Sequence, residues 1–304
     1  MRVCVIGAGA IGSLFAAHLA TVADVLVLTR RQGHAQELND RGLRVTGRHD
    51  FTARVTAAAD PRDLPEFDVG IIATKATGLE DAAESLAGRF GGATIVTVQN
   101  GLGAEEVVRR HGSWQLISAV TFMSGMKHSD THVEYILDTP TWLGPYRETP
   151  YERVQELARL LVDSGLEAEA LPDLRPAQWS KLIFNATVNG VAALTGLPHD
   201  AHFASEEGDS DLGHLVHALV DEGKLVAAAA EVELHDDPWE MNVLATKRGS
   251  AHHPSMLEDV EARRPTEVEL INGALVREAE RHGVDAPLQN AVYRLVAARE
   301  ASYS

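Results

Sequence analysis

Residues 2–19 are Arg2-Val-Cys-Val-Ile-Gly-Ala-Gly-Ala-Ile-Gly-Ser-Leu-Phe-Ala-Ala-His-Leu19. The first five residues are nearly all apolar, as in a parallel strand that is covered on both faces. Glycines follow at once and lead into the helical pattern of residues 11–19. A strand, the pattern G-x-G-x-x-G and a helix in this order predict a Rossmann-type, dinucleotide-binding α/β domain.

The glycines of this loop have separate roles. Gly7 allows the tight turn, Gly9 lets the backbone approach a pyrophosphate, and Gly12 allows close packing of the helix on the strand. The helix N-terminus adds free amides and a favourable dipole for phosphates. The alternative is a tight glycine turn that binds no ligand. The expected cofactor-binding residues of the loop are Gly7, Ala8, Gly9, Ala10, Ile11 and Gly12.

The second strand, at residues 24–28, ends in Thr29-Arg30-Arg31, where NAD-binding folds usually carry an acidic residue. Two guanidinium groups at this point suit the 2′-phosphate of NADP(H). Arg30 and Arg31 therefore predict NADPH as the cofactor. The alternative is a pair of solvated arginines at the start of a helix.

Two further strands, at residues 67–73 and 94–98, flank a helical stretch and continue the βαβ rhythm. Residues 43–55 are instead expected to form a hairpin that interrupts this order. Because ligands bind at the carboxyl ends of the strands in such sheets, we expect Lys75 and Asn100 beside the cofactor. Ordinary loop chemistry is the alternative for both: Asn-Gly is a turn signal, and Lys75 would then be a solvated charge.

The rest of the chain divides into a β-rich stretch and a helical one. Three segments are expected to extend the sheet as antiparallel strands, at residues 116–126, 133–137 and 141–143. A helix at 151–164 and a strand at 167–170 follow. From Pro172 onward the helical windows are residues 176–194, 212–232, 254–262, 265–282 and 289–301. We therefore expect a Rossmann-like domain over residues 1–171 and an all-α domain over residues 172–304.

Lys181, Asn185 and Asn189 stand four residues apart in an otherwise apolar helical pattern, which puts one cation and two amides on one helix face. Burying such groups without partners costs on the order of a few kcal/mol each, so the face is expected to line a polar pocket. The pKa of a lysine falls on burial, which makes Lys181 a candidate proton donor. The alternative is a structural polar seam between helices.

Two polar residues stand at expected helix starts in the second half. Pro265 and Thr266 mark one start, which puts Glu267 in the first turn, where a carboxylate meets free amides. Helix capping is therefore one explanation of Glu267. Ser255, which follows Pro254, has the same alternative.

Composition narrows the classes of partner. The formal net charge of −17 disfavours nucleic acid and anionic membranes. No signal-peptide pattern and no apolar run of about 18 residues are present. The single cysteine, Cys4, excludes an intrachain disulfide and favours a reducing compartment, so we expect a cytoplasmic protein. The pairs His214 with His217 and His252 with His253 lack a third ligand at suitable spacing, so no metal site is expected.

Four motifs span nearly the whole chain. They are Gly7–Gly12, Val98-Gln-Asn-Gly-Leu-Gly103, Lys181-Leu-Ile-Phe-Asn185 with Asn189, and Pro254-Ser-Met-Leu257 with Arg264-Pro-Thr-Glu267. Together, in this order, they resemble the ketopantoate reductase (2-dehydropantoate 2-reductase) family. The resemblance implies a Rossmann domain, a helical domain, and reduction of a small 2-keto acid by NADPH in the cleft between them. Ketopantoate, which is reduced to pantoate in pantothenate biosynthesis, is the default substrate.

Within this reaction, Lys181 and Glu267 are the expected catalytic residues. Hydride transfer to a ketone leaves an alkoxide, and a partly desolvated Lys181 ammonium both polarises the oxygen and donates the proton. Glu267 resembles the carboxylate that the family places facing the nicotinamide ribose and the substrate. The same carboxylate favours the protonated form of Lys181.

The remaining roles concern binding. Asn185 and Asn189 are expected to hold substrate oxygens, and Ser255 to bind the carboxylate or a neighbouring hydroxyl. Asn100 is expected where cofactor and substrate meet. A homodimer through the helical domain stays open, since its apolar faces can pack within one chain or across two.

Three positions depart from the family pattern and leave the substrate open. His199 stands where the family often carries Asn, Glu258 stands where it carries Gln, and Arg263 replaces a commonly small residue. A related NADP-dependent oxidoreductase that acts on another keto or hydroxy acid is therefore the alternative. A non-catalytic NADP-binding sensor is a less favoured hypothesis, because a sensor would not need the stripe of one lysine and two asparagines.

Overall fold

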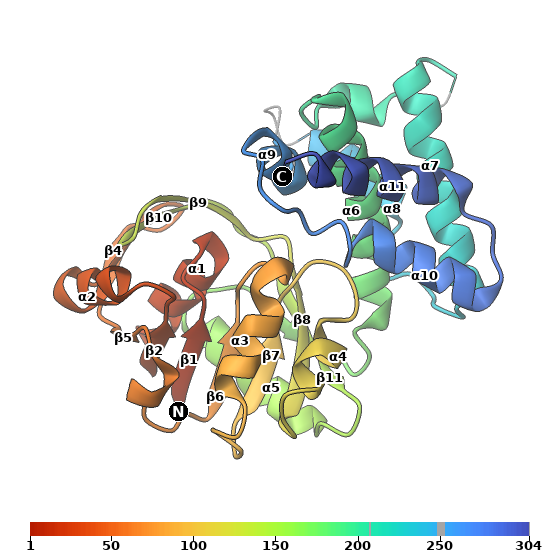
Figure 1. Cartoon of the computed structure of the whole chain (residues 1–304). Coiled ribbons are helices and arrows are strands. Elements are labelled where there is room, and N and C mark those ends of the chain that lie inside the picture. The colour runs from red at the N-terminus through yellow and green to blue at the C-terminus, as the bar shows by residue number, and fades with distance from the viewer. Residues whose placement is uncertain (207, 248–252, 304) are drawn as a thin grey trace. The chain divides into compact units, whose positions relative to one another are not determined.

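A computed structural model describes residues 1–206, 208–247 and 253–303 (Figure 1). It divides the chain into two compact units, Met1–Gln99 with Ala104–Leu174 and Asn100–Gly103 with Arg175–Ser304. The division lies three residues beyond the expected boundary, and Asn100–Gly103 belongs to the helical unit. Each unit has its own hydrophobic core.

The first unit, all of whose residues are described, is built on an eight-stranded sheet in the order β12-β11-β8-β7-β6-β1-β2-β5. Neighbours from β8 to β5 are parallel, whereas β11 is antiparallel to β8 and parallel to β12. The expected Rossmann-type α/β domain is confirmed. The strands are β1 (Arg2–Ile6), β2 (Asp24–Leu28), β5 (Thr56–Ala58), β6 (Val69–Ile72), β7 (Thr94–Thr97), β8 (Gln115–Thr121), β11 (Thr141–Tyr146) and β12 (Ala168–Ala170).

Helices cover both faces of this sheet, as the apolar pattern of β1 requires. Val3 and Val5 point into the core that includes α1 and α5, while Cys4 and Ile6 point into the core that includes α3. Figure 1 shows α3 and α4 over one face. Burial raises the pKa of the Cys4 thiol to about 12, which leaves it unreactive at neutral pH. The helices are α1 (Ala10–Leu19), α2 (Gln32–Arg41), α3 (Leu79–Leu86), α4 (Ala104–Arg109) and α5 (Tyr151–Asp163).

A second sheet covers the outer side of α1. Its order is β4-β3-β10-β9, with β3 (Leu43–Gly47), β4 (Phe51–Ala53), β9 (Ser124–Ser129) and β10 (His132–Leu137). The hairpin expected at residues 43–55 is present as β3 and β4. The expectation that residues 116–143 extend the main sheet as antiparallel strands is wrong except for β11, because β8 is parallel to β7 and β9 and β10 leave the sheet.

The burial of α1 on two sides explains this arrangement. Residues 12–19 of the helix are all buried, so a single sheet face cannot cover it. Leu14 and Phe15 share a core with Val133 and Tyr135 of β10 as well as with the main sheet. The strands that were expected at the sheet edge therefore bury the other side of this helix.

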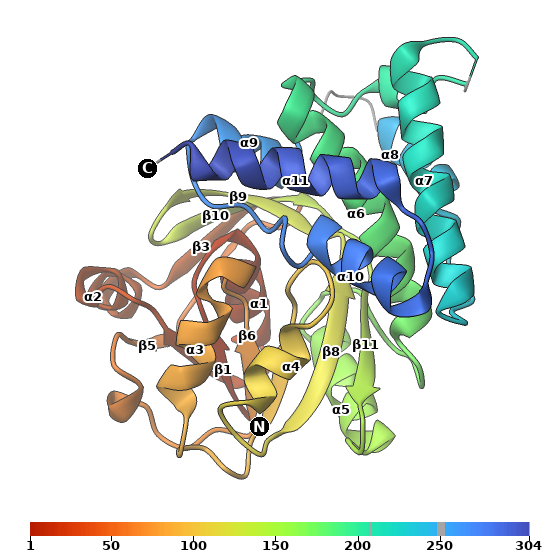
Figure 2. The same cartoon turned by 45° about the vertical axis from the view of Figure 1, so that its right-hand side comes forward.

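The second unit is helical in its described residues, as expected. Its helices are α6 (Arg175–Thr195), α7 (Asp211–Ala229), α8 (Pro238–Thr246), α9 (Ser255–Glu261), α10 (Asn272–His282) and α11 (Pro287–Ala301). All five others pack against α6, and Figure 2 shows α6 running behind α10 and α11. Gly190 and Gly223 allow the close approach, since a Cβ there would lie 2.4 Å from Val292 and 2.5 Å from Ile183. Among the described residues, none of the helices is both long and apolar enough to span a membrane.

Two elements of this unit differ from the sequence prediction. Helix α8 was not predicted, although Asp237 accepts hydrogen bonds from the amides of Trp239 and Glu240 and Pro238 occupies the first turn. Helix α10 begins at Asn272, seven residues after the expected start at Pro265.

The close packing at Gly12 in the glycine loop predicts how a substitution there changes the stability of the protein. A Cβ at Gly12 would lie 2.0 Å from the carbonyl oxygen of Gly7, so the helix and the loop would have to separate. We expect Gly12→Ala to lower the free energy of unfolding by about 1–3 kcal/mol. Calorimetry should then show a Tm several degrees lower. Gly33→Ala in α2, where no atom lies within 4 Å of the added Cβ, is the control. Equal Tm values for the two variants would contradict the packing role of Gly12.

Candidate active site

The lysine and the two asparagines lie on α6, a helix that runs without interruption from Arg175 to Thr195. Asn185 and Asn189 are each 6% exposed, while Lys181 is partly buried. Within the described parts of the chain, neither asparagine side chain makes a hydrogen bond, yet their amide atoms are not sealed from solvent. Two amides that face accessible space from an apolar helix are well placed to bind a polar ligand.

Two opposing effects set the pKa of Lys181. Burial lowers the pKa of its ammonium to about 8, because the charged form loses hydration. The negative charge of Glu267 acts in the opposite direction and limits the fall. A lysine in this balance stays largely protonated at neutral pH and still gives up its proton readily.

Glu267 lies in a turn before α10, so the expectation that it occupies the first turn of a helix is wrong. Its carbonyl oxygen accepts from the amides of Leu270 and Ile271, which closes the turn. The carbonyl of Leu270 accepts from the amide of Leu102, so this segment does not continue into α10 as a regular helix. The capping explanation of Glu267 therefore fails, and its carboxylate, at 9% exposure, is buried for another reason.

Asn100 holds this carboxylate. The Asn100 side-chain amide donates to Glu267 Oε2 at 2.9 Å, and the amide of Leu102 donates to Leu270 at 2.9 Å. Gly101 between them has a φ of 94°, and a Cβ there would lie 1.7 Å from the Leu270 carbonyl oxygen. The Asn-Gly pair is thus more than a turn signal, because it brings an amide donor against the carboxylate next to Lys181.

Ser255 is exposed at the first position of α9, and Pro254 rather than Ser255 is the N-cap residue. The capping alternative for Ser255 is therefore wrong, and its hydroxyl makes no hydrogen bond within the described residues. His199, by contrast, is buried, and its Nε2 donates to Asn242 Oδ1 at 2.8 Å. Glu258 is exposed on α9.

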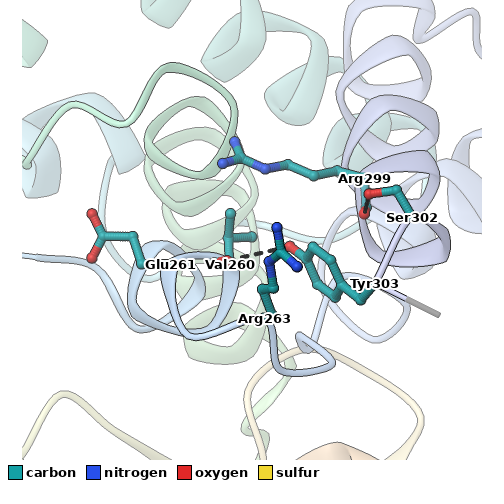
Figure 3. A pocket seen from close by; sticks show the side chains of 6 residues that line it. All are labelled: Val260, Glu261, Arg263, Arg299, Ser302 and Tyr303. Atoms are coloured by element: carbon teal, nitrogen blue, oxygen red, sulfur yellow. Dashed lines mark hydrogen bonds between the residues drawn. The ribbon is translucent and has the colours of Figure 1, made fainter.

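A surface hollow lies between the ends of α9 and α11 (Figure 3) and is lined by Val260, Glu261, Arg263, Arg299, Ser302 and Tyr303. Arg263 has a φ of 50°, the left-handed conformation in which α9 ends. The hydroxyl of Tyr303 donates to the Val260 carbonyl at 3.5 Å. None of the predicted catalytic or substrate-binding residues lines this hollow, so it is distinct from the Lys181 face.

Histidine pairs do not form metal sites in the described part of the chain. The ring of His217 lies against that of Trp239 in a tilted arrangement, with centroids 3.7 Å apart, and His252 lies outside the described residues. No group of three His, Cys, Asp or Glu side chains in that part is placed to hold a metal ion.

In the first unit, the glycine loop has the features that a dinucleotide needs. Gly7 has a φ of 100°, and Gly9 precedes α1 with open space around it. Thr74 Oγ1 and Gln99 Oε1 are buried without a hydrogen-bond partner among the described residues. Both residues follow strands of the sheet at their carboxyl ends, and Thr74 is adjacent to Gly7. A bound dinucleotide offers polar groups to such atoms, so these residues fit the expected cofactor.

The predicted cationic residues lie at strand ends of the same unit. Arg30 and Arg31 are exposed after β2, and Lys75 is exposed after β6. The guanidinium of Arg31 contacts both carboxylate oxygens of Asp130, at 2.7 and 2.6 Å.

Gln99 and Lys127 also have structural contacts near the glycine loop, although the sequence did not predict them as site residues. The side-chain amide of Gln99 donates to the carbonyls of Ile72 and Thr74 at 2.8 and 2.9 Å, which fixes the loop after β6. Lys127 Nζ donates to the carbonyl of Ala8 at 2.7 Å. The chain has five lysines in 304 residues, and this rarity was a usable signal for Lys127, but no pattern placed β9 beside the glycine loop.

Two family models match the chain, described as Ketopantoate reductase PanE/ApbA over residues 3–148 and Ketopantoate reductase PanE/ApbA C terminal over residues 173–300. The chain belongs to the ketopantoate reductase family. A 2-dehydropantoate 2-reductase of Archaeoglobus fulgidus is 30% identical over 295 residues, which cover 97% of this chain and 96% of the relative. One of Streptococcus pyogenes serotype M1 is 30% identical over 308 residues, which cover 99% and 98%. The chain is thus an oxidoreductase of this family.

Solved structures agree with the fold. The 2-dehydropantoate 2-reductase of Methylococcus capsulatus is 28% identical with a TM-score of 0.87, and the match covers 100% of this chain and 98% of that one. A D-mandelate dehydrogenase in complex with NADH and anilino(oxo)acetate is 24% identical with a TM-score of 0.88, covering 100% and 99%. The second likeness shows a shared fold.

Proposed function

We propose that this oxidoreductase reduces a 2-keto acid to a 2-hydroxy acid with NADPH, with 2-dehydropantoate as the first candidate substrate. The observation that carries the proposal is that the partly buried Lys181, on the helix that presents Asn185 and Asn189, lies within electrostatic reach of Glu267. The relatives named as 2-dehydropantoate 2-reductases support the choice of substrate.

Lys181 acts as the general acid. When bound, NADPH would supply a hydride to the keto carbon, and the keto oxygen would then need a proton. The Lys181 ammonium stabilises the developing negative charge and transfers its proton to that oxygen. Glu267 favours the charged form of Lys181 before the transfer. Asn100, through its bond to Glu267 Oε2, keeps the carboxylate in place.

The polar side chains around Lys181 bind the substrate. Asn185 and Asn189 donate to oxygens of the keto acid from the same helix face, because four-residue spacing aligns their side chains with Lys181. Ser255 offers an unused hydroxyl to the carboxylate or to a neighbouring hydroxyl.

Most of the proposed cofactor residues belong to the first unit, whereas Asn100 and Glu267, which are also proposed to bind the cofactor, belong to the second. Residues 7–12 would receive the pyrophosphate at the N-terminus of α1, and Arg30 and Arg31 would receive the 2′-phosphate. Lys75 lies at the carboxyl end of β6, where such cofactors bind.

A panel of 2-keto acids, followed by NADPH absorbance, tests this function. Turnover of 2-dehydropantoate with the highest kcat/KM is expected. Faster turnover of another keto acid would replace the substrate and keep the reaction class. Cofactor binding without any turnover would indicate a sensor and overturn the proposal. A higher kcat/KM with NADH than with NADPH would overturn the cofactor assignment.

Removal of the proton donor should affect the chemical step. We expect Lys181→Ala to lower kcat by about a hundredfold or more, the scale of general acid catalysis, while NADPH binding is largely kept. Steady-state kinetics and fluorescence titration with NADPH measure the two effects. Lys247→Ala, at an exposed lysine that ends α8, is the control and should behave like the parent. Parental kcat in Lys181→Ala would disprove the assignment.

The rate of reduction should also report the pKa of Lys181. The acid must be protonated, so kcat/KM should be constant below about pH 8 and fall as the pH rises through that value. Because the charge of Glu267 raises this pKa, Glu267→Gln should move the falling limb to lower pH. A pH profile of each variant with saturating NADPH provides the measurement.

The matched control for this profile is Glu280→Gln, which removes an exposed carboxylate from α10 in the same unit. Its falling limb should coincide with that of the parent. A limb at the same pH in all three proteins would show that Glu267 does not tune the proton donor.

A further inference from the structure

A carboxylate carried by the second sheet contacts an arginine that follows β2, where an acidic residue is missing. Asp130 occupies the turn between β9 and β10. Arg31 Nη2 contacts Asp130 Oδ1 at 2.7 Å and Oδ2 at 2.6 Å. Arg31 follows β2, the strand after which a dinucleotide-binding sheet usually places the carboxylate that binds the ribose hydroxyls. Asp130 therefore brings a carboxylate to the residue that follows β2 from a segment remote in sequence.

The turn that carries Asp130 is fixed against the glycine loop. Lys127, three residues before it on β9, donates from Nζ to the Ala8 carbonyl at 2.7 Å and lies 3.4 Å from Asp130 Oδ1. His34 of α2 is buried, and its Nε2 donates to the backbone carbonyl of Asp130 at 2.9 Å. The carboxylate is thus held in place by contacts to the loop and to α2.

Asp130 is also a charged group under normal conditions. Burial alone would raise the pKa of its carboxyl, but the hydrogen bond from Arg31 and the nearby charges of His34 and Lys127 hold that pKa below its ordinary value. Its side chain is 21% exposed, so a ligand can reach it.

We propose that Asp130 is a specificity-determining residue for the cofactor, which engages Arg31 and so weakens the preference of this site for a 2′-phosphate over a 2′-hydroxyl. The inference rests on the proposed binding of NADPH at the glycine loop. The Asp130 carboxylate adds a negative charge that opposes the two arginines, whose positive charges favour the phosphate.

The competition follows from simple electrostatics. A 2′-phosphate that approaches Arg31 meets the Asp130 carboxylate, which has the same sign of charge and already occupies the guanidinium. The hydroxyl of NADH has no charge to be repelled, and a carboxylate accepts its hydrogen bond. The Arg31 side chain is 64% exposed, so the pair is weak enough for a ligand to displace. Asp130 therefore reduces, without abolishing, the advantage of NADPH.

Asp130→Asn tests this role, because it keeps the shape of the side chain and removes the charge. The Kd values of NADPH and NADH are measured by fluorescence titration of the full chain. We expect the ratio Kd(NADH)/Kd(NADPH) to rise at least about threefold. This is the size of effect expected when a partly exposed ion pair no longer competes with the phosphate for Arg31. Asp130→Ser should change the ratio in the same direction if the asparagine variant folds poorly.

Two further variants show whether the effect acts through Arg31. Asp50→Asn removes an exposed carboxylate, paired with Arg44, at the β3–β4 hairpin of the same sheet, and it should leave the ratio unchanged. In an Arg31→Ala background, Asp130→Asn should have a smaller effect than in the parent, because the guanidinium that Asp130 occupies is gone.

The outcomes separate this inference from the proposed function. An unchanged ratio in Asp130→Asn, or a shift toward NADH, would overturn the role of Asp130 even if the parent prefers NADPH. A parent that prefers NADH would overturn the NADPH assignment, while a rise of the ratio in Asp130→Asn would still support the role of Asp130. Failure of the parent to bind either cofactor would overturn both.

Discussion

The burial of one ammonium group determines how the polar interior of the second unit is arranged. Lys181 loses much of its hydration on α6, and this loss must be offset by a nearby negative charge. Glu267 is that charge, but it belongs to a turn, where no regular element fixes its direction. Its position depends on Asn100, which binds the carboxylate, and on Leu102, whose amide binds the Leu270 carbonyl. The charge of Lys181 on α6 is therefore linked to two other segments, which are the turn that carries Glu267 and residues 100–102.

The proposed role of the Lys181 ammonium as a proton donor depends on a balance between burial and the charge of Glu267. Burial alone would favour a neutral amine, and a close carboxylate alone would hold the proton too firmly for transfer. Asn185 and Asn189 add hydrogen-bonding capacity without another charge, so they leave the balance intact. In the first unit, Asp130 and Arg31 likewise bring opposite charges together. Both proposed roles rest on two opposing contributions rather than on one strong contact.

The features that could be predicted from the sequence have local causes. A nearly continuous apolar run and the glycine spacing predicted β1 and α1, and four-residue spacing predicted the stripe on α6. The second sheet could not be predicted, because β3 pairs with β10 across most of the first unit and its strands resemble edge strands of the main sheet. The start of α10 was misplaced since Pro265 and Thr266 signal a turn as well as a helix. The bond from Asn100 to Glu267 joins residues 167 positions apart, which no local pattern reveals.

The enclosure of α1 between two sheets has a consequence for the order in which the chain matures on the ribosome. The helix and its glycine loop are made within the first 19 residues, yet Val133 and Tyr135 of β10 complete their cover. Until those residues leave the exit tunnel, the helix keeps an apolar side exposed to solvent. The glycine loop and α1 are therefore synthesised first but covered late, and in the interval they expose apolar surface of the kind that favours aggregation.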